Sequence, residues 1–124
     1  MANSKVEAFL DATIRKTKSE VLSWNRVNLK QFQNPVWHDY DLLRSFICSY
    51  SSGKMLLAYE MNSDMPCCFI SPDKSLPFQK ILIDEEDSAL LLRLYNLVYS
   101  QFPSVESFMD AIINSTDDSE ELPF

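Results

Sequence analysis

The fold is decided by residues 84–114, which read DEEDSALLLRLYNLVYSQFPSVESFMDAIIN. Carboxylates open this stretch, where a helix has unpaired N–H groups and the positive end of its dipole. Behind them, apolar residues recur at intervals of three and four, which is the spacing of one helical face. That face comprises Leu90, Leu91, Leu94, Leu97, Val98 and Phe102, and it is widened by Leu92, Tyr95 and Tyr99. We therefore expect a helix at about 85–102 that is covered on two sides.

A shorter helix is predicted at about 105–114. Pro103 ends the preceding helix, and Ser104 is a suitable cap for the next one. The apolar residues that follow again repeat at three and four, and they are Val105, Phe108, Met109, Ile112 and Ile113. We expect this amphipathic helix to fold back under the first, so that both belong to the core.

The N-terminal segment predicts an amphipathic helix from about residue 5 to about residue 23. Its apolar positions keep helical spacing, while charged residues occupy the opposite face. The apolar set is Val6, Phe9, Leu10, Thr13, Ile14, Thr17, Val21 and Trp24. This helix would cover either the 89–102 helix or a sheet between them.

Residues 44–83 favour a four-stranded antiparallel sheet. Apolar residues alternate on each side of turns at 51–53, 62–64 and 72–75, and the first turn contains the chain's only glycine, Gly53. Residues 24–35 could form either a short strand or a turn-rich crossing, and 36–42 resemble an irregular loop. The fold class is α+β: residues 1–115 are predicted to form one domain and 116–124 a flexible acidic tail.

Composition excludes several classes of function. The net charge is −7, with acidic residues concentrated in the C-terminal part, which argues against nucleic acid or anionic membranes as direct ligands. A single glycine leaves no phosphate-binding loop, so no cofactor is predicted. No stretch resembles a membrane span or signal peptide, and an odd number of cysteines suits a reducing compartment. We therefore expect a cytoplasmic protein.

Catalytic and metal sites are weakly supported. His38 is the only histidine, and Asp39 and Asp41 lie beside it, but no cysteine signature accompanies them. Cys67 and Cys68 should point to opposite faces of a strand, so we expect one buried thiol and one surface thiol rather than a shared metal ion. We assign no catalytic residue and no metal ligand.

Two places could bind a partner protein. Trp37, His38 and Tyr40 form an aromatic-rich group, and aromatic residues anchor interfaces. The acidic tail ends in an apolar segment typical of a docking peptide, with Glu120, Glu121, Leu122 and Phe124 as its candidate contacts. A core-rim position for the aromatics and a merely solvated tail are the alternatives.

The order of elements, with LYNLV at 94–98 and VESFMDAII at 105–113, is similar to small uncharacterised helix–sheet–helix proteins of bacteria, phages and mobile elements. The resemblance implies a fold and a setting but no activity.

We expect a non-enzymatic interaction or regulatory module that binds another protein. One alternative is an acidic phage-type inhibitor that imitates nucleic acid, and a second is a small enzyme using His38 or a cysteine. Binding by an acidic mimic should weaken steeply with salt. The apolar second face of the 89–102 helix would also suit a homodimer.

Overall fold

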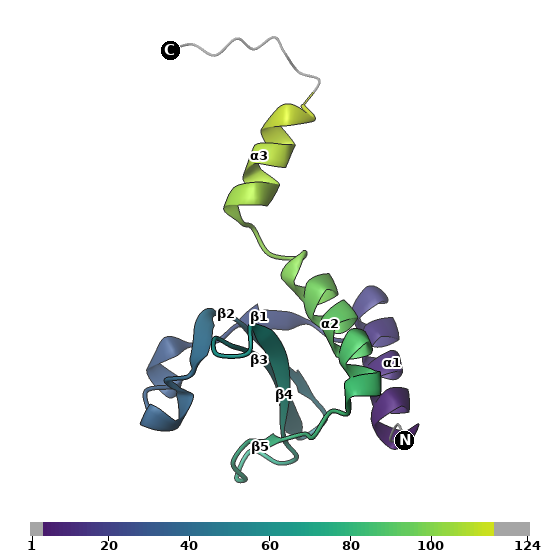
Figure 1. Cartoon of the computed structure of the whole chain (residues 1–124), viewed down its shortest axis with the longest axis vertical. Helices are drawn as coiled ribbons and strands as arrows, with labels where there is room; N and C mark the ends of the chain where they lie inside the picture. The colour runs from purple at the N-terminus through teal and green to yellow at the C-terminus, as the bar shows by residue number, and fades with distance from the viewer. Residues whose placement is uncertain (1–3, 116–124) are drawn as a thin grey trace.

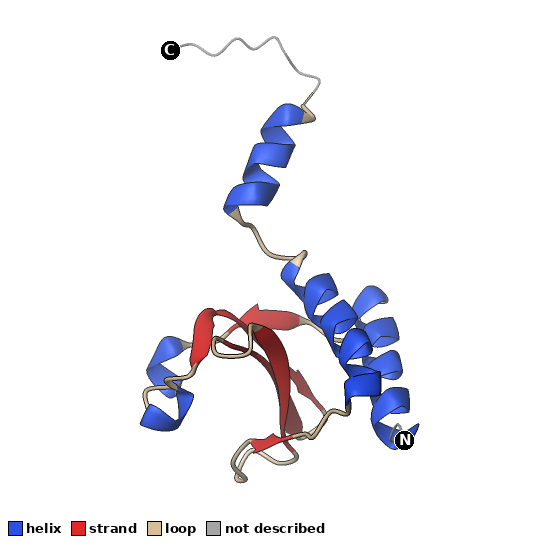
Figure 2. Cartoon of the chain, viewed as in Figure 1, coloured by secondary structure: helices blue, strands red, loops and turns tan. Residues whose placement is uncertain are grey.

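The computed structural model describes residues 4–115 and has an α+β architecture (Figure 1). Two helices pack together beside one curved sheet, and a third helix stands away from this body (Figure 2). The helices are α1 (Ser4–Lys18), α2 (Glu85–Tyr99) and α3 (Val105–Ile113), and two short 3-10 turns are η1 (Leu29–Gln31) and η2 (Pro35–Trp37).

The sheet is antiparallel, with its five strands in chain order. They are β1 (Trp24–Arg26), β2 (Tyr40–Tyr50), β3 (Gly53–Glu60), β4 (Met65–Ser71) and β5 (Gln79–Lys80). The predicted antiparallel meander is confirmed, but the prediction of four strands is wrong because β1 adds a fifth at the edge beside β2. Residues 24–35 combine both expected alternatives, a short strand followed by a turn-rich crossing.

One face of the sheet packs against α1 and α2. Alternate residues of the central strands point to this side, which is the period of a strand. The strands contribute Phe46, Cys48, Met55, Leu57, Tyr59 and Cys68, and the helices contribute Leu10, Ile14, Leu91, Leu94, Tyr95 and Val98. The helix α2 is therefore covered on two sides, by α1 and by the sheet, as its wide apolar surface predicts.

The opposite face of the sheet has a core of its own. The chain between β1 and β2 crosses this face through η1 and η2, and it brings Val27 and Phe32 onto Leu56, Ala58, Cys67 and Phe69. The expected irregular loop at 36–42 is thus partly regular, since η2 ends at Trp37 and β2 begins at Tyr40. Both faces of the sheet are consequently covered.

The first helix is shorter than expected, because α1 ends at Lys18 rather than near residue 23. Glu20 adopts a positive φ of 67°, its N–H donates to the Thr17 carbonyl, and the Val21 N–H donates to the Lys16 carbonyl. This pair of bonds is the Schellman ending of a helix, which usually has glycine at the left-handed position. Because this position is occupied by Glu20 rather than glycine, the sequence gives no indication that the helix ends here.

We expect Gly53→Ala to destabilise the fold by about 1–3 kcal/mol. A Cβ at this position would lie 2.6 Å from the Ser71 carbonyl oxygen and 2.9 Å from that of Pro72, both of them backbone atoms. The strand ends would have to separate to admit it. Urea unfolding would measure the loss of unfolding free energy. The control is Ser52→Ala, a substitution at the exposed neighbouring residue. Equal unfolding free energies for the two variants would contradict this close approach.

Candidate functional site

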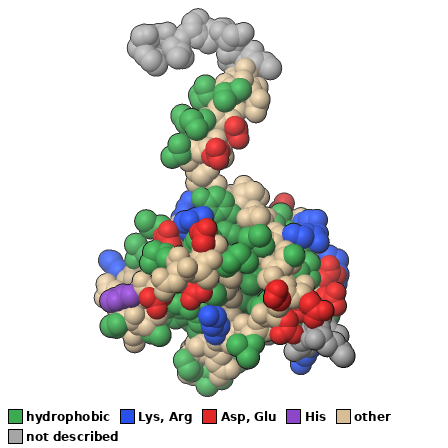
Figure 3. Space-filling model, in the orientation of Figure 1, with side chains coloured by type: hydrophobic (Ala, Val, Ile, Leu, Met, Phe, Trp, Pro, Cys, Tyr) green, Lys and Arg blue, Asp and Glu red, His purple; other side chains and the backbone are tan. Residues whose placement is uncertain are grey.

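The helix α3 exposes a complete apolar face. None of its residues is buried, and Val105 is 78%, Phe108 68% and Ile113 74% exposed. Figure 3 shows its hydrophobic side chains gathered along one edge of the helix, with acidic side chains on the other side. A contiguous apolar surface of this kind marks an interaction site in a folded protein. The expectation that this helix folds back into the core is wrong.

The helix α3 carries its own start signal. The Ser107 N–H donates to the Ser104 hydroxyl oxygen at 3.0 Å, and the Ser104 N–H donates to the Ser107 hydroxyl oxygen at 2.8 Å. This reciprocal capping box satisfies two N–H groups at the helix N-terminus. The cap predicted at Ser104 is therefore confirmed, and it forms without help from the body.

A contact to the sheet fixes the point from which α3 projects. The Arg26 guanidinium lies 5.3 Å from the Phe102 ring centroid and donates to the Pro103 carbonyl oxygen at 3.0 Å. The Phe102 ring stacks on Phe46 with centroids 4.7 Å apart. Because Ser104 alone separates this anchored segment from α3, the helix is held out from the body as an arm, as Figure 1 shows.

The packing of α2, together with the contacts of Arg26 with Phe102 and Pro103 (the anchor), also explains why α3 does not fold back. The two apolar sides of α2 already contact α1 and the sheet, so they offer no vacant surface for another helix. At its C-terminal end, Tyr99 and Phe102 pack on Phe46. These contacts complete the core before the chain reaches α3.

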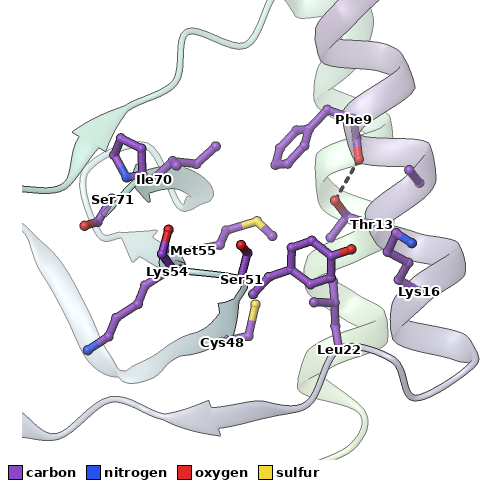
Figure 4. Close-up of a pocket in the computed structure, with 15 residues that line it drawn as sticks. Phe9, Thr13, Lys16, Leu22, Cys48, Ser51, Lys54, Met55, Ile70 and Ser71 are labelled. Carbon is purple, nitrogen blue, oxygen red and sulfur yellow. Dashed lines mark hydrogen bonds between the residues drawn. The ribbon is translucent and has the colours of Figure 1, made fainter. Parts of the chain in front are cut away.

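A groove opens between α1 and the turn that joins β2 to β3. Its volume is about 360 Å³, and Figure 4 shows apolar side chains around it. These side chains include Phe9, Leu22, Cys48, Met55 and Ile70. Lys16 on α1 is the basic side chain at the groove, because Lys54 alternates with Met55 along β3 and points away from the groove (Figure 4). No acidic residue is among the described residues that line the groove. The groove is thus apolar, with one basic side chain, Lys16, at its border.

The aromatic group proposed from the sequence belongs largely to the second core. The Trp37 ring is half-buried, with its centroid 5.1 Å from those of both Phe32 and Phe69. Tyr40 is also half-buried and lies 5.8 Å from the Trp37 ring centroid. His38 ends η2 and is exposed. Glu120, Glu121, Leu122 and Phe124 lie outside the described residues.

The cysteines do not have the character of nucleophiles. Burial raises the pKa of Cys48 and that of Cys68 to about 12, and burial is also the main cause of the raised pKa of Cys67. A catalytic thiol needs a lowered pKa, because the thiolate is the reactive form. Cys67 and Cys68 point to opposite faces as expected, but the expected surface thiol is wrong because the 27–37 crossing covers Cys67.

Sequence reasoning missed both the groove and the Arg26 anchor. The groove is formed by α1, a turn and the end of β4, which are distant in the chain and become adjacent only through the fold. Arg26 is one charged residue in an edge strand of three residues, and nothing in the sequence relates it to Phe102. For α3, the sequence feature that marked a binding helix was the apolar repeat of residues 105–113.

Comparisons with protein-family models, curated proteins and solved structures gave no significant match. In the part of the chain that the structure describes, no helix has the length and apolar character needed to cross a membrane. Within residues 4–115, no three His, Cys, Asp or Glu side chains gather in a way that could hold a metal ion.

Proposed function

We propose that this chain is a non-enzymatic protein-binding module and that α3 is the arm with which it binds. The main supporting observation is that α3 exposes its apolar face. The helix has its own N-terminal cap, and the Arg26 contact with Pro103 holds the segment before it on the sheet. Helices that dock into grooves use anchors at positions i, i+3, i+4 and i+7. Val105, Phe108, Met109 and Ile112 have this spacing.

The acidic residues of α3 indicate that the partner's binding surface should carry basic residues. Glu106 and Asp110 are one helical turn apart on the acidic side of α3, and the helix has no Lys or Arg. Glu106 borders the apolar face, because it precedes Ile113 by seven residues, which is two helical turns. A groove with apolar walls and a cationic border would complement both features. Full burial of one large apolar side chain contributes about 1.5–3 kcal/mol, so four anchors can outweigh the entropic cost of association.

We also propose a reducing compartment such as the cytoplasm. Cys48, Cys67 and Cys68 are all free, and buried free thiols persist where disulfides do not form. A setting in bacteria or phages is likewise a proposal, which the resemblance of the sequence supports.

Site-specific photocrosslinking in the native cell would test the arm. A photoreactive phenylalanine analogue in place of Phe108 is expected to form a covalent adduct of defined mass with a protein partner. The same analogue at Leu82, which is 84% exposed on the body, is the matched control and should form no such adduct. Ile112→Asp should abolish the adduct at 108, because it introduces a charge into the apolar face.

The adduct at 108 should also weaken when Glu106 and Asp110 are both changed to lysine, since the partner's border is expected to be cationic. Absence of any protein adduct at 108, or equal adducts at 108 and 82, would overturn the proposal. An adduct that resists Ile112→Asp would show that the apolar face is not the binding surface.

A further inference from the structure

We propose that the groove beside α1 receives α3 from a second copy of this chain, so that two chains associate by exchanging their C-terminal helices. This inference rests on the proposed binding role of α3 and names its partner. The chain carries both an unpartnered apolar helix and a groove suited to such a helix.

The first argument is shape and apolar character. An apolar cavity of about 150 Å³ accommodates one benzene ring. The groove, at about 360 Å³, therefore has room for roughly two side chains of that size, such as Phe108 and Ile112. Its opening between α1 and the β2–β3 turn lets the remaining apolar residues of α3 lie along its walls (Figure 4).

The second argument is charge. The arm presents Glu106 and Asp110 without a basic residue, whereas the groove has Lys16 at its border and no acidic residue among its described lining. Opposite charges at the border of an apolar contact determine partner and orientation.

The third argument is the anchor. Arg26 holds Phe102 and Pro103 on the sheet, and Ser104 is the only residue between them and α3, which leaves the body in the direction shown in Figure 1. A second copy can take this projecting arm without breaking the anchor. Reciprocal exchange uses the same two surfaces in each copy and closes as a symmetric dimer.

Sedimentation equilibrium of the full chain would measure the association. We expect wild-type protein to dimerise and Ile112→Asp to raise the dimer dissociation constant about a hundredfold, because it places a charge in the apolar groove. Leu82→Asp alters an even more exposed apolar residue away from both surfaces and should leave the constant unchanged. Circular dichroism would confirm that each variant remains folded.

A charge exchange gives the sharper test. Lys16→Glu, and separately the pair Glu106→Lys with Asp110→Lys, should each raise the dissociation constant about threefold or more. Mixing the two variants should restore association as a one-to-one heterodimer, because each arm then meets a groove of opposite charge. If the groove variant unfolds, Lys16→Gln should still weaken the dimer.

Three results would overturn this inference. They are a monomer at every concentration, a dimer indifferent to Lys16→Glu, and the absence of a heterodimer on mixing. If the photoreactive residue at 108 then captures a different protein in a manner that depends on Ile112, the binding role of α3 stands while the second copy is excluded. Capture of no protein refutes both.

Discussion

Replacing Leu94 with alanine is expected to lower the free energy of unfolding by about 3–5 kcal/mol. Its side chain is 0% exposed on α2, in the core that α1 and the sheet share. The truncation removes apolar contacts and leaves a cavity that close-packed neighbours fill only in part. Domains are commonly stable by about 5–15 kcal/mol, so the variant should lose a large share of its stability. Urea denaturation would measure the change.

Leu92→Ala is the matched control for this prediction. Leu92 lies on the same helix and is 37% exposed, so its truncation should cost about 1 kcal/mol or less. Ile113→Ala on the arm should change the unfolding free energy by about 0.5 kcal/mol or less, since α3 takes no part in the core. Equal losses at residues 92 and 94 would contradict the packing of α2 described above.

Periodicity predicted the elements that pack on the body. Along β3, Met55 and Leu57 face one core while Leu56 and Ala58 face the other, as strict alternation requires. The wide apolar surface of α2 likewise indicated two covering layers. These predictions succeeded because burial on a face leaves a repeating pattern in the chain.

The same reasoning could not assign a location to α3. Apolar residues three and four positions apart indicate that one face of a helix is buried against another surface. They do not indicate whether that surface belongs to this chain or to another one. The deciding facts are contacts between distant residues, above all Arg26 with Phe102 and Pro103. Short elements also escape a periodicity argument, and β1 has too few residues to alternate.

For the candidate site too, the sequence predicted some features and not others. Sequence reasoning marked Trp37 because aromatic residues are common at interfaces, yet a large aromatic residue is equally suited to a core. The 27–37 crossing, which covers the second face of the sheet, determines how Trp37 is used in the fold. No local pattern predicts such a crossing, because its residues keep neither the strand period nor the helix period.

Trp37→Ala is expected to lower the free energy of unfolding by about 2–4 kcal/mol, close to the range for truncation of a large core aromatic. Besides Phe32 and Phe69, its ring lies near Tyr40 and near Phe78, with centroids 5.8 Å and 6.3 Å away. Edge-to-face pairs of this kind add about 0.5–1.5 kcal/mol each beyond the area they bury. The loss should therefore exceed that of truncating an exposed aromatic residue.

His38→Ala provides the comparison, because His38 is the next residue and is exposed. It should change the unfolding free energy by about 0.5 kcal/mol or less. If Trp37 served only to contact a partner, its truncation would weaken binding and leave urea unfolding at the wild-type midpoint. A shifted midpoint for Trp37→Ala, together with an unchanged one for His38→Ala, would instead establish that Trp37 stabilises the second core.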